Sequence, residues 1–143
     1  MFQRRSGSSR GAAKPHVLFV DDEKLVLEGL RDSLRRFPFH IHSANSADEG
    51  FEILANHDID VVVSDERMPQ MSGSEFLALV CERYPETVRL ILSGQEGPAT
   101  GHRALYEGEV ARFVRKPCQA RELADIITQA LEEARRRRED SDD

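Results

Sequence analysis

Charged residues directly follow three short apolar runs, and this pattern constrains the fold more than any other feature of the chain. The charged groups that end these runs are Asp21-Asp22-Glu23, Asp65 and Lys116-Pro117. Short apolar runs bounded by polar residues are typical of buried parallel strands. In an open α/β sheet, ligands bind where the carboxyl ends of the strands emerge. If the three runs are neighbouring strands, carboxylates and one ammonium group meet at one edge of the sheet.

Such a group of carboxylates requires a cation, because like charges packed together repel one another. Oxygen ligands suit Mg²⁺, which keeps several waters and takes a phosphate oxygen as a further ligand. The sequence therefore predicts a magnesium site at the strand ends that carry Asp21, Asp22 and Asp65, with Lys116 beside it.

Length and composition are those of one compact domain. The chain has 143 residues, of which 39% are hydrophobic and 32% charged, and its net charge of −6 argues against general nucleic-acid binding. Residues 1–15 are basic and rich in Ser and Gly, so we expect a disordered tail before a domain at 16–133. Residues 134–143 are expected to form a charged C-terminal tail. No apolar run approaches the ~18 residues of a membrane span.

The cysteines and histidines favour structural roles. Cys81 and Cys118 lie far apart without a CxxC partner, so we expect free thiols in a reducing cytoplasm, with a structural role favoured over redox sensing. His40 and His42 would share one face of a strand, but no acidic or Cys partner stands at zinc-site spacing. Surface histidines are therefore the favoured interpretation.

Strand and helix signals alternate along the chain, which predicts βαβ units and a doubly wound parallel sheet. Strands are expected at residues 16–20, 39–44, 60–64, 88–92 and 110–114. Helices are expected at 23–36, after Ser46 with Glu49 forming a capping box, from Ser74 to before Pro85, over a short glycine-interrupted stretch at 98–106, and at 122–138.

Four motifs in this order resemble the receiver domain of two-component response regulators, the CheY-like superfamily. They are Asp21-Asp22, the run DERMPQMSG at 65–73, Ser93-Gly94 and the run FVRKP at 113–117. The resemblance covers roughly residues 16–131. It implies the flavodoxin-like fold, with a five-stranded parallel sheet in the order 2-1-3-4-5 flanked by five helices.

The resemblance also implies a phosphorylation site. Asp65 would be the phosphoacceptor for a histidine kinase or phosphotransfer protein. Asp22 and Asp65 would bind Mg²⁺ together with the backbone carbonyl of Arg67, and Asp21 would act through a bound water. Such a domain assists its own phosphorylation and dephosphorylation and is not otherwise an enzyme.

Further residues would stabilise the phosphoryl group and respond to it. Lys116 would place a positive charge on a phosphoryl oxygen, and Ser93 would donate its hydroxyl to the group. Phe113 would change rotamer with Ser93. Three residues depart from common members of the family: Ser93 replaces Thr, Phe113 replaces Tyr and Cys118 replaces Trp. None of these changes removes a group that the chemistry needs.

Several alternatives remain open at the level of sequence. Flavodoxin-like flavin carriers need a hydroxyl-rich loop where this chain has Asp21-Asp22-Glu23, and aspartate-based phosphatases need a second Asp where Glu23 stands. A receiver-like interaction scaffold that is not phosphorylated is a third alternative. The stretches at 84–89 and 107–113 look most like receivers that precede cyclic-di-GMP phosphodiesterase output domains, so the chain is also read as an N-terminal fragment of such a regulator.

The partners of a receiver would meet it at a face that changes with phosphorylation. We expect an output protein, or a second copy in a homodimer, on the face formed by the fourth helix, the fifth strand and the last helix. The arginines at 135–138 sit near a helix C-terminus and close to acidic residues, so a solvated helix end is favoured over nucleic-acid binding.

Overall fold

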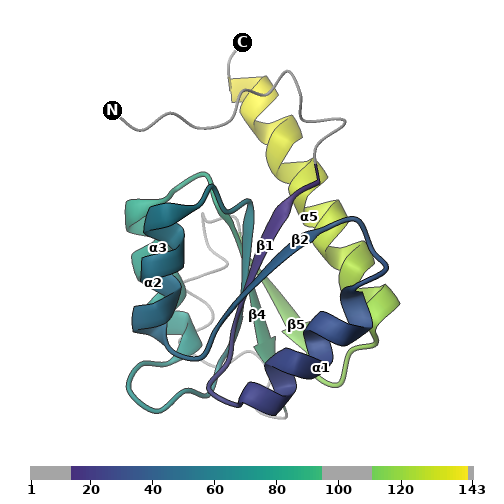
Figure 1. The fold of residues 1–143 in the computed structure, drawn as a ribbon. Coiled ribbons are helices and arrows are strands. Elements are labelled where there is room, and N and C mark those ends of the chain that lie inside the picture. Colours follow the sequence, from purple (N-terminus) through teal and green to yellow (C-terminus); the bar gives the residue numbers. More distant parts are fainter. Residues whose placement is uncertain (1–13, 95–110, 142–143) are drawn as a thin grey trace.

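A parallel sheet with helices on both faces forms the core of the molecule (Figure 1). The computed structural model describes residues 14–94 and 111–141. Its strands are β1 (His16–Val20), β2 (His40–Ala44), β3 (Val61–Asp65), β4 (Val88–Ser93) and β5 (Ala111–Arg115). Its helices are α1 (Lys24–Leu34), α2 (Ala47–Asn56), α3 (Gly73–Arg83) and α5 (Ala120–Ser141).

The order of the strands is β2-β1-β3-β4-β5, and every neighbouring pair is parallel. This confirms the doubly wound sheet and its expected order. The third strand ends one residue later than predicted, because Asp65 still pairs with Leu92 of β4. The helix expected at 98–106 lies outside the described residues, as do residues 1–13 of the expected tail.

Each face of the sheet packs against its own helices. Alternating residues of the central strands, such as Phe19 and Leu18, point to opposite sides and enter different core clusters. One cluster joins the sheet to α1 and α5 through Leu34 and Ile127, which are fully buried. The other joins it to α2 and α3, and includes the buried Phe76. Figure 1 shows the two helix pairs on either side of the sheet.

Two helix starts differ in detail from the sequence prediction. At α2 the Ser46 hydroxyl accepts from the Glu49 N–H at 3.1 Å as expected, but the Glu49 carboxylate accepts from the Asn45 N–H instead of completing the box. Helix α3 begins at Gly73, so the prediction that Ser74 opens it was wrong. Ser72 is its N-cap, because Ser72 and Glu75 exchange both bonds of a full capping box.

The first and last helices have different lengths from those expected. Helix α1 is shorter, since it begins at Lys24 and ends at Leu34. Helix α5 is longer, and its regular turns continue through Ser141 with Ala134 still buried. Figure 1 shows α5 extending past the edge of the sheet. No helix within residues 14–94 and 111–141 is long and apolar enough to cross a lipid bilayer.

Candidate functional site

The acidic and basic residues singled out in the sequence lie at the carboxyl ends of three strands. Asp21 follows β1, Asp65 is the last residue of β3, and Lys116 follows β5. Because all strands run in the same direction, these ends meet at one edge of the sheet. The fold therefore brings together residues that are almost one hundred positions apart, as the sequence pattern predicts.

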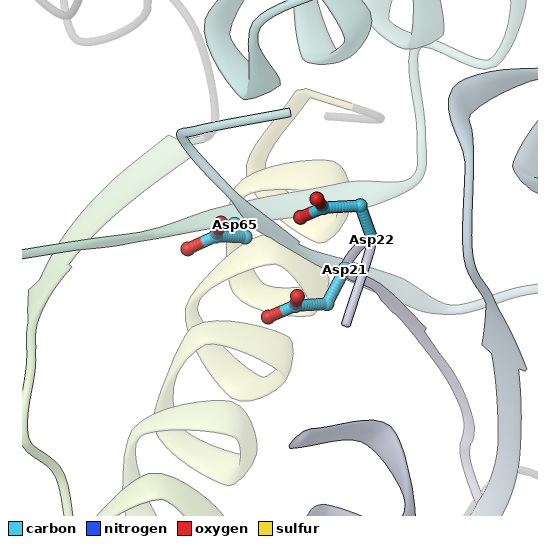
Figure 2. A group of neighbouring side chains, drawn as sticks. All are labelled: Asp21, Asp22 and Asp65. Atoms are coloured by element: carbon cyan, nitrogen blue, oxygen red, sulfur yellow. The ribbon is translucent and has the colours of Figure 1, made fainter. Parts of the chain in front are cut away.

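Asp21, Asp22 and Asp65 form one group of carboxylates, and Figure 2 shows them turned to the same side. Each contributes an oxygen, and the three oxygens lie within 4.8 Å of one another. Asp21 and Asp65 are buried, whereas Asp22 is exposed. This donor set, all oxygen and open to solvent on one side, fits a hard divalent cation such as Mg²⁺.

Burial is the main influence on Asp21. It raises the pKa of this carboxyl, the Glu23 N–H bound to Oδ1 at 2.9 Å lowers it, and the neighbouring charge of Asp65 raises it again. The net pKa lies above the ordinary value. Without a cation the three carboxylates thus repel one another, and a divalent ion would relieve that repulsion.

Lys116 is the cation that lies against the group. Its Nζ is 2.5 Å from Oδ1 of Asp65. Burial lowers the pKa of Lys116, but the hydrogen bond and charge of Asp65, together with the charges of Asp21 and Glu23, outweigh burial and raise it. The backbone N–H of Lys116 donates to the Ser93 carbonyl at 2.8 Å, which fixes the start of this loop on β4. The Lys116-Pro117 peptide bond is cis.

The loop after β3 is held by Glu66 and Gly73, two residues of the 65–73 motif to which the sequence analysis assigned no role. The Glu66 carboxylate accepts from both the N–H and the hydroxyl of Ser74, at 2.9 and 2.8 Å. The Gly73 N–H donates to the Glu66 carbonyl, and a Cβ at Gly73 would stand only 2.2 Å from the Asp65 carbonyl oxygen. A side chain at this position would push the loop away from Asp65. The Ser-x-x-Glu spacing of the α3 cap is the signal that marks where this loop ends.

A hollow of ≈520 Å³ opens beside the acidic group. Its lining includes Asp22, Glu66, Arg67 and Ser72. Arg67, whose backbone carbonyl was expected to be a metal ligand, therefore lies on the same side of the molecule as Asp22. The hollow is open to solvent.

Ser93 and Phe113 occupy different surroundings from the carboxylates. The Ser93 hydroxyl is buried and has no hydrogen-bond partner among the residues described. Such an orphaned donor is uncommon in a folded protein and is consistent with a ligand that completes it. Phe113 is half-buried and packs against the core cluster on the α2 and α3 face, at a position paired with Ile91 of β4.

Neither cysteine forms a disulfide within the described residues, and both are half-buried. Cys118 packs against the core cluster that faces α1 and α5, and burial, with the charge of Glu122, raises the pKa of its thiol. A raised pKa leaves less thiolate at neutral pH, which supports the structural interpretation over redox sensing for this residue.

Comparison with known proteins gives the same family that the motifs suggested. The model of the response regulator receiver domain matches residues 17–128. The hydrogenase transcriptional regulatory protein HoxA of Cupriavidus necator is 35% identical over 116 residues, which are 81% of this chain and 24% of that protein. The two-component response regulator ORR5 of Oryza sativa subsp. japonica is 30% identical over 131 residues, which are 90% of this chain and 96% of that protein. The chain thus spans about a quarter of HoxA and nearly all of ORR5.

Solved structures agree with the sequence relatives. The signal receiver domain of an HD domain-containing protein from Pseudomonas fluorescens Pf-5 superposes with a TM-score of 0.76 at 34% identity, covering 85% of this chain and 98% of that one. A response regulator receiver domain protein from Clostridium thermocellum superposes with a TM-score of 0.77 at 27% identity, covering 85% and 97%. With its sheet order, its acidic group and its lysine in place, this chain belongs to the family of response regulator receiver domains.

Proposed function

We propose that this receiver domain is a phosphorylation-dependent switch in which Asp65 accepts a phosphoryl group from a histidine kinase or a phosphotransfer protein. One observation carries the proposal: Oδ1 of Asp65 lies 2.5 Å from the Lys116 ammonium, while Asp21 and Asp22 hold oxygens within 4.8 Å. Asp65 combines a nucleophilic oxygen with a fixed positive charge and the donors for a divalent ion. The surrounding residues of the sheet hold these groups in place.

The transfer itself is a displacement at phosphorus. A carboxylate oxygen of Asp65 forms the new P–O bond as the P–N bond to the donor imidazole breaks, and the electron pair of that bond stays on the nitrogen. Lys116 remains beside the carboxylate throughout the transfer, so its positive charge stabilises the negatively charged phosphoryl oxygens. The phosphoryl group adds about −1.5 to −2 charges to a strand end that is already acidic.

Mg²⁺ is the cofactor that the donor set suits. We expect Asp22, Asp65 and the Arg67 backbone carbonyl to hold it directly and Asp21 to act through a water. When bound, the ion would neutralise the carboxylates and take a phosphoryl oxygen as a ligand. Asp21, with its raised pKa, gains most from this neutralisation because it is the most buried of the three.

The signal would pass from Asp65 to Ser93 and then to Phe113. The Ser93 hydroxyl, which has no partner among the described residues, would donate to the phosphoryl group and draw the end of β4 toward Asp65. Phe113, only half-buried, would follow into the space this opens. A packed element that has two alternative arrangements can be shifted from one to the other by a small change at the phosphoryl group. The surface that partners contact then changes as well.

The output contact is expected on the face that includes β5 and α5. On this face an ion pair joins Arg112 to Glu133, the side chains of which are 33% and 41% exposed. A separate output protein, an output domain in a longer regulator, and a second copy in a homodimer are the three partners that this proposal allows. The similarity to HoxA and to the receiver domain of an HD domain-containing protein favours a regulator that works with an output domain. We expect the switch to act in the cytoplasm, as its two free thiols suggest.

Intact-mass measurement tests the proposal. The wild-type protein, Asp65→Asn and Asp48→Asn are each incubated with Mg²⁺ and a small phosphodonor. Asp48 is an exposed aspartate of α2 and serves as the matched control. We expect one added phosphoryl group on wild type and on the control, and none on Asp65→Asn. If neither the wild-type protein nor any variant gains mass, the protein is a receiver-like interaction scaffold that is not phosphorylated, and the proposal is wrong.

A further inference from the structure

Four of the five histidines gather at the edge of the sheet opposite the acidic group. His16 begins β1, His40 and His42 belong to β2, and His57 is the C-cap of α2. The strands start at this edge, and the C-terminus of α2 reaches it from the side (Figure 1). The histidines were expected to be surface residues, with only His40 and His42 placed on one face, and the fold brings four of them together.

The parallel register of β1 and β2 explains this grouping. His16 pairs directly with His40, and His42 pairs with Leu18. Because side chains alternate along a strand, residues 16, 18, 40 and 42 all project to the face that α2 and α3 cover. Leu18 belongs to the core cluster of that face. His57 then closes the group from the end of α2.

The imidazole rings contact one another in a row. The His16 ring stacks on His40, with centroids 4.5 Å apart and planes inclined by 24°. Nδ1 of His16 lies 2.9 Å from Nε2 of His42. The His42 ring in turn meets the His57 ring at a centroid distance of 4.8 Å, tilted by 46°. The backbone of His16 is fixed by Asp60, whose carboxylate accepts from the His16 N–H at 2.8 Å.

The two ring nitrogens share a hydrogen bond, and their separation is also that of two nitrogens in a metal chelate. Two nitrogens bound to one ion at about 2.0–2.1 Å stand about 2.8–3.0 Å apart when they are cis in square-planar or octahedral coordination, and about 3.3 Å apart in a tetrahedron. The 2.9 Å between His16 and His42 matches the first arrangement. On metal binding the proton of this hydrogen bond would leave the shared position, and both rings would turn a lone pair toward the ion.

We propose that His16 and His42 chelate one divalent late transition-metal ion, of the class of Ni²⁺ or Cu²⁺, with His57 as the third ligand. His57 is exposed, so its ring is free to rotate toward the ion. Within the described part of the chain, only the aspartate group already has three donor atoms within 4.8 Å. The histidine site therefore forms from the close pair, and the third ring joins on binding.

This ion would be distinct from Mg²⁺ in kind and in place. Imidazole nitrogen suits Ni²⁺, Cu²⁺ and Zn²⁺, whereas Mg²⁺ prefers oxygen. From His16 to the end of β1 at Val20 the strand rises about 13 Å, so the two ions would lie at opposite ends of the sheet. His40 acts in this site through His16, because its stacked ring restricts how the His16 ring turns.

Calorimetric titration of untagged, chelator-treated protein with Ni²⁺ tests the proposal. Ni²⁺ is chosen because the free thiols would reduce Cu²⁺. We expect one site in wild type, and at least about tenfold weaker binding in His16→Gln and in His42→Gln, since each loses one of few ligands. His57→Ala should also weaken binding. Because His57 is an exposed residue at the end of α2, this variant should keep its fold.

Two controls separate this site from others. His102→Gln changes the fifth histidine and should bind Ni²⁺ like wild type, and Asp22→Ala should lose the Mg²⁺ response but keep Ni²⁺ binding. The absorption of the Ni²⁺ complex should report nitrogen ligands in wild type and change in His57→Ala. Equal Ni²⁺ affinity in wild type and His57→Ala, or a loss of affinity in His102→Gln alone, would overturn the assignment.

Discussion

The ammonium group of Lys116 lies 2.5 Å from Oδ1 of Asp65, and this ion pair connects the ends of two strands that are not neighbours. Strand β4 stands between β3 and β5 in the sheet. The Lys116 backbone is bonded to the Ser93 carbonyl at the end of β4, so all three strand ends are tied together. A change in the charge of Asp65 therefore acts directly on the ends of β4 and β5.

Replacing Lys116 by Met should slow phosphorylation of Asp65 by about 10²-fold or more, because a preorganised positive charge next to the transferred group is lost. The side chain of Lys116 is 41% exposed, so the fold should survive the change. The rate of mass gain with a small phosphodonor measures the effect. Lys14→Met, at an exposed lysine, is the control. An unchanged rate in Lys116→Met would remove this lysine from the chemistry.

Gly73→Ala and Gly29→Ala form a matched pair. The new Cβ at Gly73 would lie 2.2 Å from the Asp65 carbonyl oxygen, whereas nothing lies within 4 Å of a Cβ at Gly29. We expect Gly73→Ala to lower the free energy of unfolding by roughly 2 kcal/mol or more and to impair phosphorylation. Gly29→Ala, within α1, should raise it by about 0.5–1 kcal/mol.

Urea denaturation measures both changes. If Gly73→Ala is as stable and as readily phosphorylated as wild type, then the close approach of the loop to Asp65 does not govern the site.

Much of this site can be predicted from the sequence, because the ends of the buried strands can be predicted from it. Asp21 and Lys116 follow apolar runs, and parallel strands bring their carboxyl ends to one edge. The order of the strands came from the family resemblance and not from periodicity. The first residue of α3 was harder to predict, because Ser72 and Ser74 are both residue types that commonly cap a helix N-terminus. Only the fold shows that Glu75 caps with Ser72 while Glu66 binds Ser74.

Mg²⁺ should stabilise the wild-type protein, because it relieves repulsion among Asp21, Asp22 and Asp65 in the folded state only. We expect the melting temperature to rise by several degrees. For a domain of this size, such a rise corresponds to a gain of roughly 1–2 kcal/mol in the free energy of unfolding from Mg²⁺ binding. Asp22→Ala should lose most of this rise and should be at least as stable as wild type without Mg²⁺. Differential scanning calorimetry with and without Mg²⁺ gives both values.

Asp48→Asn should respond to Mg²⁺ like the wild-type protein. A full Mg²⁺ response in Asp22→Ala would mean that Asp22 is not a ligand.

Stability should fall on mild acidification through His42. Burial, followed by the nearby His57, His16 and His40, lowers the pKa of His42 from 6.5 to about 4 in the folded protein. Between these values the unfolded chain binds a proton that the folded chain does not, so stability decreases as the pH falls from about 6.5 to 4. The effect should be about 1 kcal/mol, because the ring is only partly buried and solvent screens the neighbouring charges.

Urea denaturation at several pH values in metal-free buffer measures this slope. His42→Gln should flatten it and His102→Gln should leave it unchanged. A slope that is the same in His42→Gln would assign the acid sensitivity to other groups.

The histidine group shows what the sequence alone cannot reveal. The spacing of His40 and His42 places both on one face of a strand, and this much is readable from a period of two. Their contact with His16 depends on the register of β1 against β2, and their contact with His57 depends on where α2 ends. Both are properties of tertiary packing, and no local pattern encodes them.

Phosphorylation should change the end of β4 and the start of β5 more than the rest of the sheet. The reason is that the Ser93 hydroxyl has no partner within the described residues and Phe113 is only half-buried. Hydrogen exchange with and without beryllofluoride should therefore differ most across residues 93–114. Ser93→Ala should reduce that difference while Asp65 still binds the mimic. Changes confined to 65–73, or centred on α1 and α2, would contradict this route.

The most direct test of the central claim is to locate the phosphoryl group. After incubation with Mg²⁺ and a phosphodonor, borohydride reduces an aspartyl phosphate to homoserine, and peptide mass spectrometry then identifies the residue. We predict homoserine at position 65 and nowhere else, with the signal lost when Mg²⁺ is chelated. Homoserine at position 21 or 22, or an unmodified Asp65 under conditions that phosphorylate the protein, would contradict the account.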